Sequence, residues 1–150
     1  MAARIKKPKV QLVRFNREEL FDEYFEDMNC LACVSTFESF QFIHTLNMLL
    51  DRNFRLDLEM INDKGGVAYK IYNDVDTIRS IDYNVICNRN RTDYLIPELL
   101  NSDFLLLMNG MKSHPDLLEN ITTLLKSEKR ISYSYVFEPL KLKSKEYLVL

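Results

Sequence analysis

Two short stretches of uninterrupted apolar residues constrain the fold of this chain more than any other feature. They span residues 30–34 (CLACV) and 104–108 (FLLLM), and each has the length of a strand rather than of a helix. A strand that is apolar at every position is typical of one buried on both faces of a sheet. The sequence therefore predicts two central strands.

A helix signal follows each of these stretches. Ser35 and Glu38 have the spacing of a capping box, in which two side chains satisfy backbone N–H groups at a helix start. A second helix begins at residues 113–116, with Pro115 in its first turn. The first helix has an apolar face formed by Phe40, Ile43, Leu46, Leu50 and Phe54, widened by Phe42 and Leu49. The apolar face of the second helix consists of Leu117, Leu118, Ile121, Leu124 and Leu125.

Alternation of apolar and polar residues predicts the remaining strands. Residues 67–72 follow a turn at Gly65-Gly66 as a hairpin partner, and residues 80–88 form a third antiparallel strand. Residues 54–60 precede that turn, and their expected dry face consists of Phe54, Leu56, Leu58 and Met60. The clearest half-buried strand is residues 131–137, with an apolar side formed by Ile131, Tyr133, Tyr135 and Phe137.

The order of these elements is strand–helix–strand, two further strands, then strand–helix–strand. We expect an α+β fold, a ferredoxin-like or ACT-like sandwich with an antiparallel-rich sheet. Two helices cover one face of this sheet, and the middle hairpin is enlarged. The length of 150 residues predicts a single domain, with residues 1–16 as a loosely held basic N-terminal segment.

Composition excludes several functional classes. The chain has 20 basic and 22 acidic side chains and a net charge of -2, whereas phosphate-backbone binding usually needs a basic surplus. It has no apolar run near the roughly 20 residues that cross a bilayer, and no secretory signal. We therefore expect a cytoplasmic protein with no membrane partner, and an odd count of 3 cysteines agrees with a reducing compartment.

No catalytic, metal or cofactor constellation is expected. Cys30 and Cys33 form a C-x-x-C, but inside a strand this spacing directs the two sulfurs to opposite faces. Zinc needs four ligands, usually as two close pairs, and Cys87, His44 and His114 have no such neighbours in sequence. We interpret the cysteines as buried apolar residues and the histidines as surface residues.

Tyrosines on the expected strands leave a second functional class open. They are Tyr69, Tyr72, Tyr83, Tyr133 and Tyr135. Aromatic side chains on an open sheet face can stack RNA bases, although the net charge disfavours RNA here. In strands, tyrosine is more often a half-buried residue whose hydroxyl reaches water. Tyr72 is the candidate for an exposed binding tyrosine, because it alternates with Val67, Tyr69 and Ile71.

A resemblance to a known family rests on Leu95-Ile96-Pro97-Glu98, followed by Asp103-Phe104. These residues resemble the motif of the IPExxVDY family, small uncharacterised proteins of the phylum Bacteroidota. Residues 31–51 and the ending at residues 140–148 are also similar to that family. The motif departs from the family pattern in its spacing, in Ser102 for Val and in Phe104 for Tyr. The resemblance implies a cytoplasmic bacterial protein and brings no catalytic residues.

Two interpretations of this motif stay open. Pro97 forces an extended bend that feeds the chain into a central strand, with Glu98 or Asp103 capping backbone N–H groups. Alternatively, Pro97, Glu98 and Asp103 form a binding edge near the strand entrance. We expect a non-enzymatic interaction or regulatory module that binds a protein partner or a second copy through an exposed sheet face or edge. An RNA-associated accessory protein and an enzyme with an unrecognised site are the alternatives.

Overall fold

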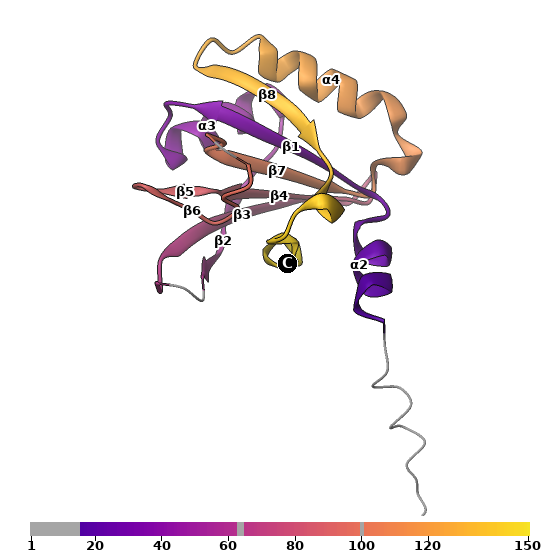
Figure 1. Cartoon of the computed structure of the whole chain (residues 1–150). Coiled ribbons are helices and arrows are strands. Elements are labelled where there is room, and N and C mark those ends of the chain that lie inside the picture. Colours follow the sequence, from indigo (N-terminus) through magenta and orange to yellow (C-terminus); the bar gives the residue numbers. More distant parts are fainter. Residues whose placement is uncertain (1–15, 63–64, 100) are drawn as a thin grey trace, which may run out of the picture.

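The computed structural model describes residues 16–62, 65–99 and 101–150. It shows an α+β fold built on a six-stranded antiparallel sheet (Figure 1). The predicted basic segment at residues 1–16 lies outside the described residues, except for Asn16, whose side chain caps the first helix. The sheet strands are β1 (Met28–Ser35), β2 (Arg55–Ile61), β3 (Ala68–Asp76), β4 (Ile81–Cys87), β7 (Phe104–Asn109) and β8 (Ile131–Phe137). The helices are α2 (Arg17–Phe25), α3 (Ser39–Leu50) and α4 (Pro115–Lys126), with short 3-10 turns η2 (Met111–Ser113), η3 (Pro139–Lys141) and η4 (Lys145–Leu148). A separate two-stranded ribbon consists of β5 (Arg89–Asn90) and β6 (Asp93–Tyr94).

The two apolar stretches are neighbours in the middle of the sheet, as predicted. The strand order is β2-β3-β4-β7-β1-β8, and each strand is antiparallel to its neighbours. Leu31 of β1 lies opposite Leu106 of β7. The outer strands are β2 and β8.

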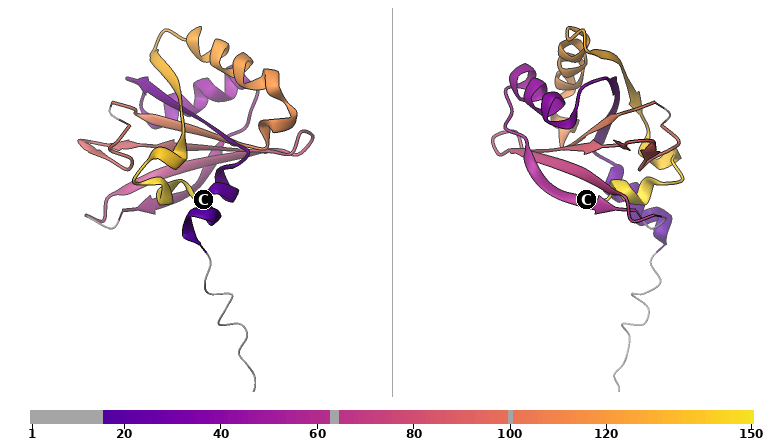
Figure 2. Two further views of the ribbon diagram at one scale, coloured as in Figure 1. Left: turned by 45° about the vertical axis from the view of Figure 1, so that its right-hand side comes forward. Right: turned by 90° about the vertical axis from the view of Figure 1, so that its left-hand side faces the viewer.

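Helices α3 and α4 cover one face of the sheet side by side (Figure 2). The ring of Phe42 stacks on that of Phe104 with centroids 3.9 Å apart. The predicted capping box is wrong by three residues: Glu38 and Gln41 form it, and Ser35 is the last residue of β1. Phe40, which was predicted on the apolar face, lies outside the core and is 68% exposed, whereas Phe42, Ile43 and Leu46 are buried.

A second layer covers the opposite face. Phe25 of α2, Ile96 and Leu148 of η4 pack against residues of β1 and β7 that include Ala32 and Leu105. Figure 2 shows α2 and the C-terminal segment on the side of the sheet opposite α3 and α4. The middle of the sheet is therefore dry on both faces, and the open face that the sequence predicted is covered here.

A β-bulge overturns the predicted dry face of residues 54–60. The register slips between Leu56 and Leu58 and leaves Asp57 without a partner on β3. Leu56 lies opposite Tyr72 and Leu58 opposite Ile71, so the two leucines point to opposite faces. Because β2 is an outer strand, both leucines are exposed.

The predicted apolar side of β8 is also interrupted. The register with β1 shifts where Ser35 lies opposite Ile131 and Val34 opposite Tyr133. Ile131 therefore packs in the helix-side core, whereas Phe137 packs in the core of the second layer. Tyr133 lies outside both cores and is 61% exposed.

Candidate functional site

The Ile96-Pro97-Glu98 segment belongs to a loop that one buried amide organises. The side chain of Asn88 accepts a hydrogen bond from the backbone N–H of Ile96 (2.8 Å) and donates to the backbone oxygen of Ser102 (2.8 Å). Ile96 itself is fully buried against the second face of the sheet. The loop thus forms part of the layer that covers this face.

Pro97 and Glu98 are exposed at the surface of this loop. The Glu98 carboxylate accepts hydrogen bonds from the backbone N–H and the hydroxyl of Ser144, both at 2.8 Å. Desolvation raises the pKa of Glu98, but hydrogen bonds from Ser144, together with backbone N–H groups of Glu98 and Lys143, outweigh it and leave the pKa below its usual value. Glu98 therefore fastens the C-terminal segment to the loop.

Asp103 connects three elements at the entrance of β7. Its Oδ2 accepts a hydrogen bond from the backbone N–H of Ser35 (2.8 Å), and its Oδ1 lies 2.7 Å from Nε of Arg89. The backbone N–H of Asp103 donates to the oxygen of Cys33 (2.8 Å). This carboxylate joins β1, β7 and the β5–β6 ribbon.

Tyr72, the fourth predicted binding residue, lies on β3, two strands away from β7. It is half-buried beside the helix-side core, in register between Leu56 and Val85. The exposed strand tyrosine is Tyr133 instead, whereas Tyr69 and Tyr83 are buried. The structure therefore brings the predicted residues into no common site.

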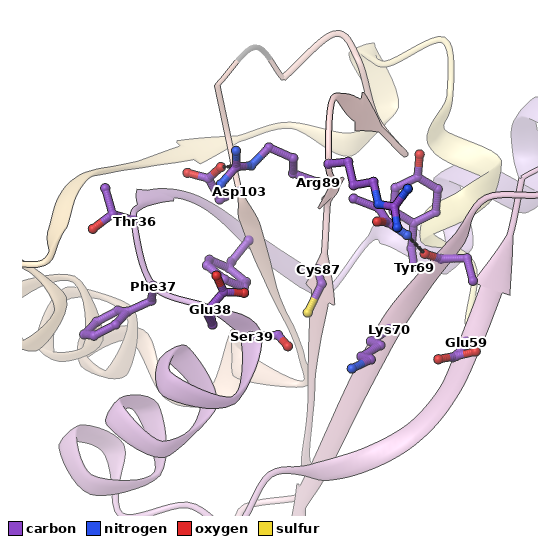
Figure 3. A pocket seen from close by; sticks show the side chains of 14 residues that line it. Thr36, Phe37, Glu38, Ser39, Glu59, Tyr69, Lys70, Cys87, Arg89 and Asp103 are labelled. Atoms are coloured by element: carbon purple, nitrogen blue, oxygen red, sulfur yellow. Dashed lines mark hydrogen bonds and ion pairs between the residues drawn. The ribbon is translucent and has the colours of Figure 1, made fainter.

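A cavity of about 490 Å³ opens beside Asp103, between the start of α3, the strands β2–β4 and the β5–β6 ribbon (Figure 3). Its floor includes the buried side chains of Phe104 and Cys87. Glu38 and Ser39 face Cys87 and Lys70 across the hollow (Figure 3). The charged residues around it are Glu38, Glu59, Lys70, Arg89, Arg91 and Asp103.

Sequence reasoning missed the arginines of this cavity. Arg89 and Arg91 belong to the stretch Asn-Arg-Asn-Arg, which has the composition of an ordinary polar loop. Arg89 lies on β5 and Arg91 in the turn that follows it, so no strand periodicity links the two arginines to a common site. The carboxylates and Lys70 reach the cavity from separate strands, which no local pattern reveals.

The outer edge of β8 is a second feature of note. Its seven residues carry no charged side chain. Tyr133 is 61% and Val136 57% exposed. At its end, a groove of about 210 Å³ is lined by Val136, Leu140 and other residues. Within the described ranges no strand pairs with this edge.

Cys87 lines the cavity and Cys30 lines the groove at the end of β8, whereas Cys33, His44 and His114 line neither. Cys30 and Cys33 face opposite sides of the sheet, as predicted, and all three thiols are free and buried. His44 is exposed, and Nε2 of His114 lies 3.3 Å from the backbone oxygen of Arg79. In residues 16–62, 65–99 and 101–150, no three His, Cys, Asp or Glu side chains are grouped to hold a metal ion. No helix in the same part of the chain is long and apolar enough to cross a membrane.

Comparisons of this chain with models of protein families and with curated proteins found no match.

Proposed function

We propose that this chain is a non-enzymatic interaction module in which the free edge of β8 pairs with β8 of a second copy. One observation carries the proposal: β8 is an outer strand of seven uncharged residues with two large exposed side chains, Tyr133 and Val136. An uncharged edge with no neighbouring strand offers backbone N–H and C=O groups to another strand. Strand addition would satisfy these groups and bury both side chains.

The edge of β2 is a poorer candidate for the same role. It carries Arg55, Asp57 and Glu59, and it is bent by the bulge at Asp57. Charged side chains and bulges are the devices by which proteins protect an edge strand from pairing. The register of β8 also shifts, at Ser132, but β8 carries no charged side chain, and this difference in charge favours pairing through β8.

A second copy fits β8 because the strand is self-complementary. In a two-fold antiparallel pair centred on Ser134, Tyr133 lies opposite Tyr135 of the second copy, and Ser132 lies opposite Val136. Every opposed pair is then uncharged, and aromatic cross-strand pairs stabilise a sheet by up to about 1 kcal/mol each. The same two-fold antiparallel pairing of β2 with β2 of a second copy, centred on Asp57, places the Asp57 carboxylates of the two copies opposite each other.

The fold supports this arrangement by analogy. We propose that the strand order is a ferredoxin-like or ACT-like arrangement in which the hairpin of β2 and β3 enlarges the sheet. ACT-like domains commonly pair through sheet edges. Membership of the IPExxVDY family and a cytoplasmic location remain parts of this proposal, supported by the residues quoted above for the resemblance.

The test is the mass of the protein in solution, measured by light scattering on a size-exclusion column over a range of concentrations. We expect twice the chain mass of 17.8 kDa for the unaltered protein. Val136→Lys should shift the equilibrium to the monomer, because it places a charge inside the paired edge.

Leu56→Lys is the matched control. Leu56 is 55% exposed on the other outer strand, against 57% for Val136, so both changes add the same charge to a similarly exposed edge position. This control should remain a dimer. A monomeric unaltered protein at every concentration, or equal dissociation by both variants, would refute pairing through β8.

A further inference from the structure

We propose that the cavity beside Asp103 binds a small organic anion, through Lys70 and Arg91. This inference concerns a surface other than the β8 edge and does not depend on self-association. The cavity of about 490 Å³ falls in the range of about 300–1,000 Å³ typical of small-molecule sites. The residues that line it, shown in Figure 3, include none of β8.

Two of the three cations that line the cavity have no carboxylate partner in the described part of the chain. Both oxygens of Asp103 are engaged, by the Ser35 N–H and by Arg89. Glu38 is engaged as the cap of α3, so the first turn of that helix is also satisfied. Lys70 and Arg91 make no ion pair with any residue in the described part of the chain. Glu59 is the one carboxylate among the lining residues with no described ion pair or hydrogen bond.

Glu59 does not neutralise Lys70 in the structure. The two residues lie opposite each other across β2 and β3, yet no ion pair joins them in the described structure. A ligand with a negative head group can therefore contact the Lys70 ammonium and the Arg91 guanidinium. Both groups donate charge-assisted hydrogen bonds to carboxylate and phosphate oxygens.

The backbone presents Arg91 at a position that does not favour arginine. Its φ is 60°, in the left-handed region where glycine or asparagine is less strained. The ribbon is held in place by a hydrogen bond from the Asn90 side chain to the backbone oxygen of Ala68 (2.7 Å). A strained residue on an anchored ribbon, beside a cavity, is the kind of outlier from which a binding role is inferred.

Apolar side chains on the floor of the cavity favour a ligand with an organic body over a bare ion. Phe104 is 4% and Cys87 7% exposed, and both line the cavity together with Phe37. The rest of the lining is mostly polar, so these three residues supply apolar surface that an organic body would contact. The ligand class is thus an anionic head group, carboxylate or phosphate, on a compact apolar or aromatic body.

Three probes with the same body test this inference by backbone amide chemical shifts at constant ionic strength. Phenyl phosphate and benzoate carry the two anionic head groups, and benzyl alcohol is the neutral match. We expect at least one anion to perturb amides of residues 36–39, 68–70 and 89–91 in a saturable manner, and benzyl alcohol to have no such effect. The relative affinity of the two anions identifies the head group.

Variants then test the two cations. Lys70→Ala and Arg91→Gly should each weaken binding of the preferred anion by about fivefold or more. Arg91→Gly also relieves the positive φ, so it should leave the fold at least as stable as before. Lys126→Ala, at an exposed lysine on α4, is the control and should bind normally. Glu59→Gln should tighten binding, because it removes a competing negative charge.

Three results would overturn the inference. The first is that neither anion gives saturable shifts, and the second is that benzyl alcohol binds as well as the anions. The third is that Lys70→Ala and Arg91→Gly bind the preferred anion as tightly as Lys126→Ala does.

Discussion

The fully buried side chain of Asn88 makes hydrogen bonds that no apolar residue can replace. In Asn88→Ala, the N–H of Ile96 and the oxygen of Ser102 lose these partners inside the protein. We expect the free energy of unfolding to fall by about 2–4 kcal/mol, measured by urea denaturation. Asn120→Ala, at an exposed position of α4, should be neutral or slightly stabilising because alanine favours helix. Equal losses in the two variants would contradict a special role for Asn88.

Asp76 is the residue for which we expect a dependence of stability on pH. The backbone N–H of Arg79 lowers the pKa of Asp76, burial opposes this, and the guanidinium groups of Arg79 and Arg52 lower it further; the net shift is downward. A lowered folded-state pKa gives stability that is present above the unfolded value of about 3.9 and is lost as the pH falls below it.

Asp76→Asn should therefore reduce the free energy of unfolding by about 2 kcal/mol at pH 7, since it weakens charge-assisted hydrogen bonds. The difference between the two proteins should shrink at pH 3. The measurement is urea denaturation of both proteins at the two pH values. A difference that grows toward acid would show that the sign is wrong.

Among the elements, the turn after β7 depends on Gly110. Its φ is 107°, and an added Cβ would overlap the backbone oxygen of Ser80. Gly110→Ala should cost more than about 1 kcal/mol and lower the thermal unfolding midpoint. Gly65→Ala is the matched change, because there the new Cβ meets only a side-chain carbon of Val67 at 3.8 Å and φ is not positive. A midpoint that falls equally in both variants would rule out this clash as the cause.

Periodicity located the six strands of the main sheet and the helices α3 and α4, but not α2 or the β5–β6 ribbon, and it did not reveal where the chain departs from regularity. The apolar runs of β1 and β7 predicted their central and adjacent positions because only a doubly covered strand is apolar throughout. An alternating pattern cannot show an extra residue, so the bulge at Asp57 reversed the expected face of Leu58. Similarly, the capping pattern can be read at Ser35 or at Glu38. The helix uses Glu38, because β1 continues through Ser35.

The candidate sites were less predictable than the elements. The sequence indicated a sheet edge in general, but the choice of β8 depends on the strand order and on Tyr133 lying outside both cores. The cavity joins Lys70 of β3 to Arg91 of the ribbon and Glu59 of β2. Pairing of strands that are distant in the sequence brings these residues together, so their spacing along the chain does not predict the group.

For the whole molecule, the order of strands predicts a gradient of stability across the sheet. Backbone amides of β1 and β7 should exchange most slowly with solvent, because both strands are paired on two sides and covered on two faces. Amides of β2, an outer strand with mostly exposed residues, should exchange much faster. Hydrogen exchange followed by mass spectrometry or by NMR measures this gradient. Fast exchange in β1 or β7 would contradict the architecture.

The second layer of the fold is assembled from distant parts of the chain. The α2 helix precedes the sheet, whereas η3 and η4 follow its last strand, and the hydroxyl of Tyr24 accepts a hydrogen bond from the N–H of Leu150 (2.9 Å). During synthesis on the ribosome, α2 emerges early but cannot find these partners until residues 139–150 have been released. For that interval the side of the sheet bearing Ala32 and Leu105 lacks the part of its cover that η3 and η4 supply, and exposed apolar surface promotes aggregation. We therefore expect chaperones and the rate of translation to affect the folding of this half of the molecule more than that of the half covered by α3 and α4.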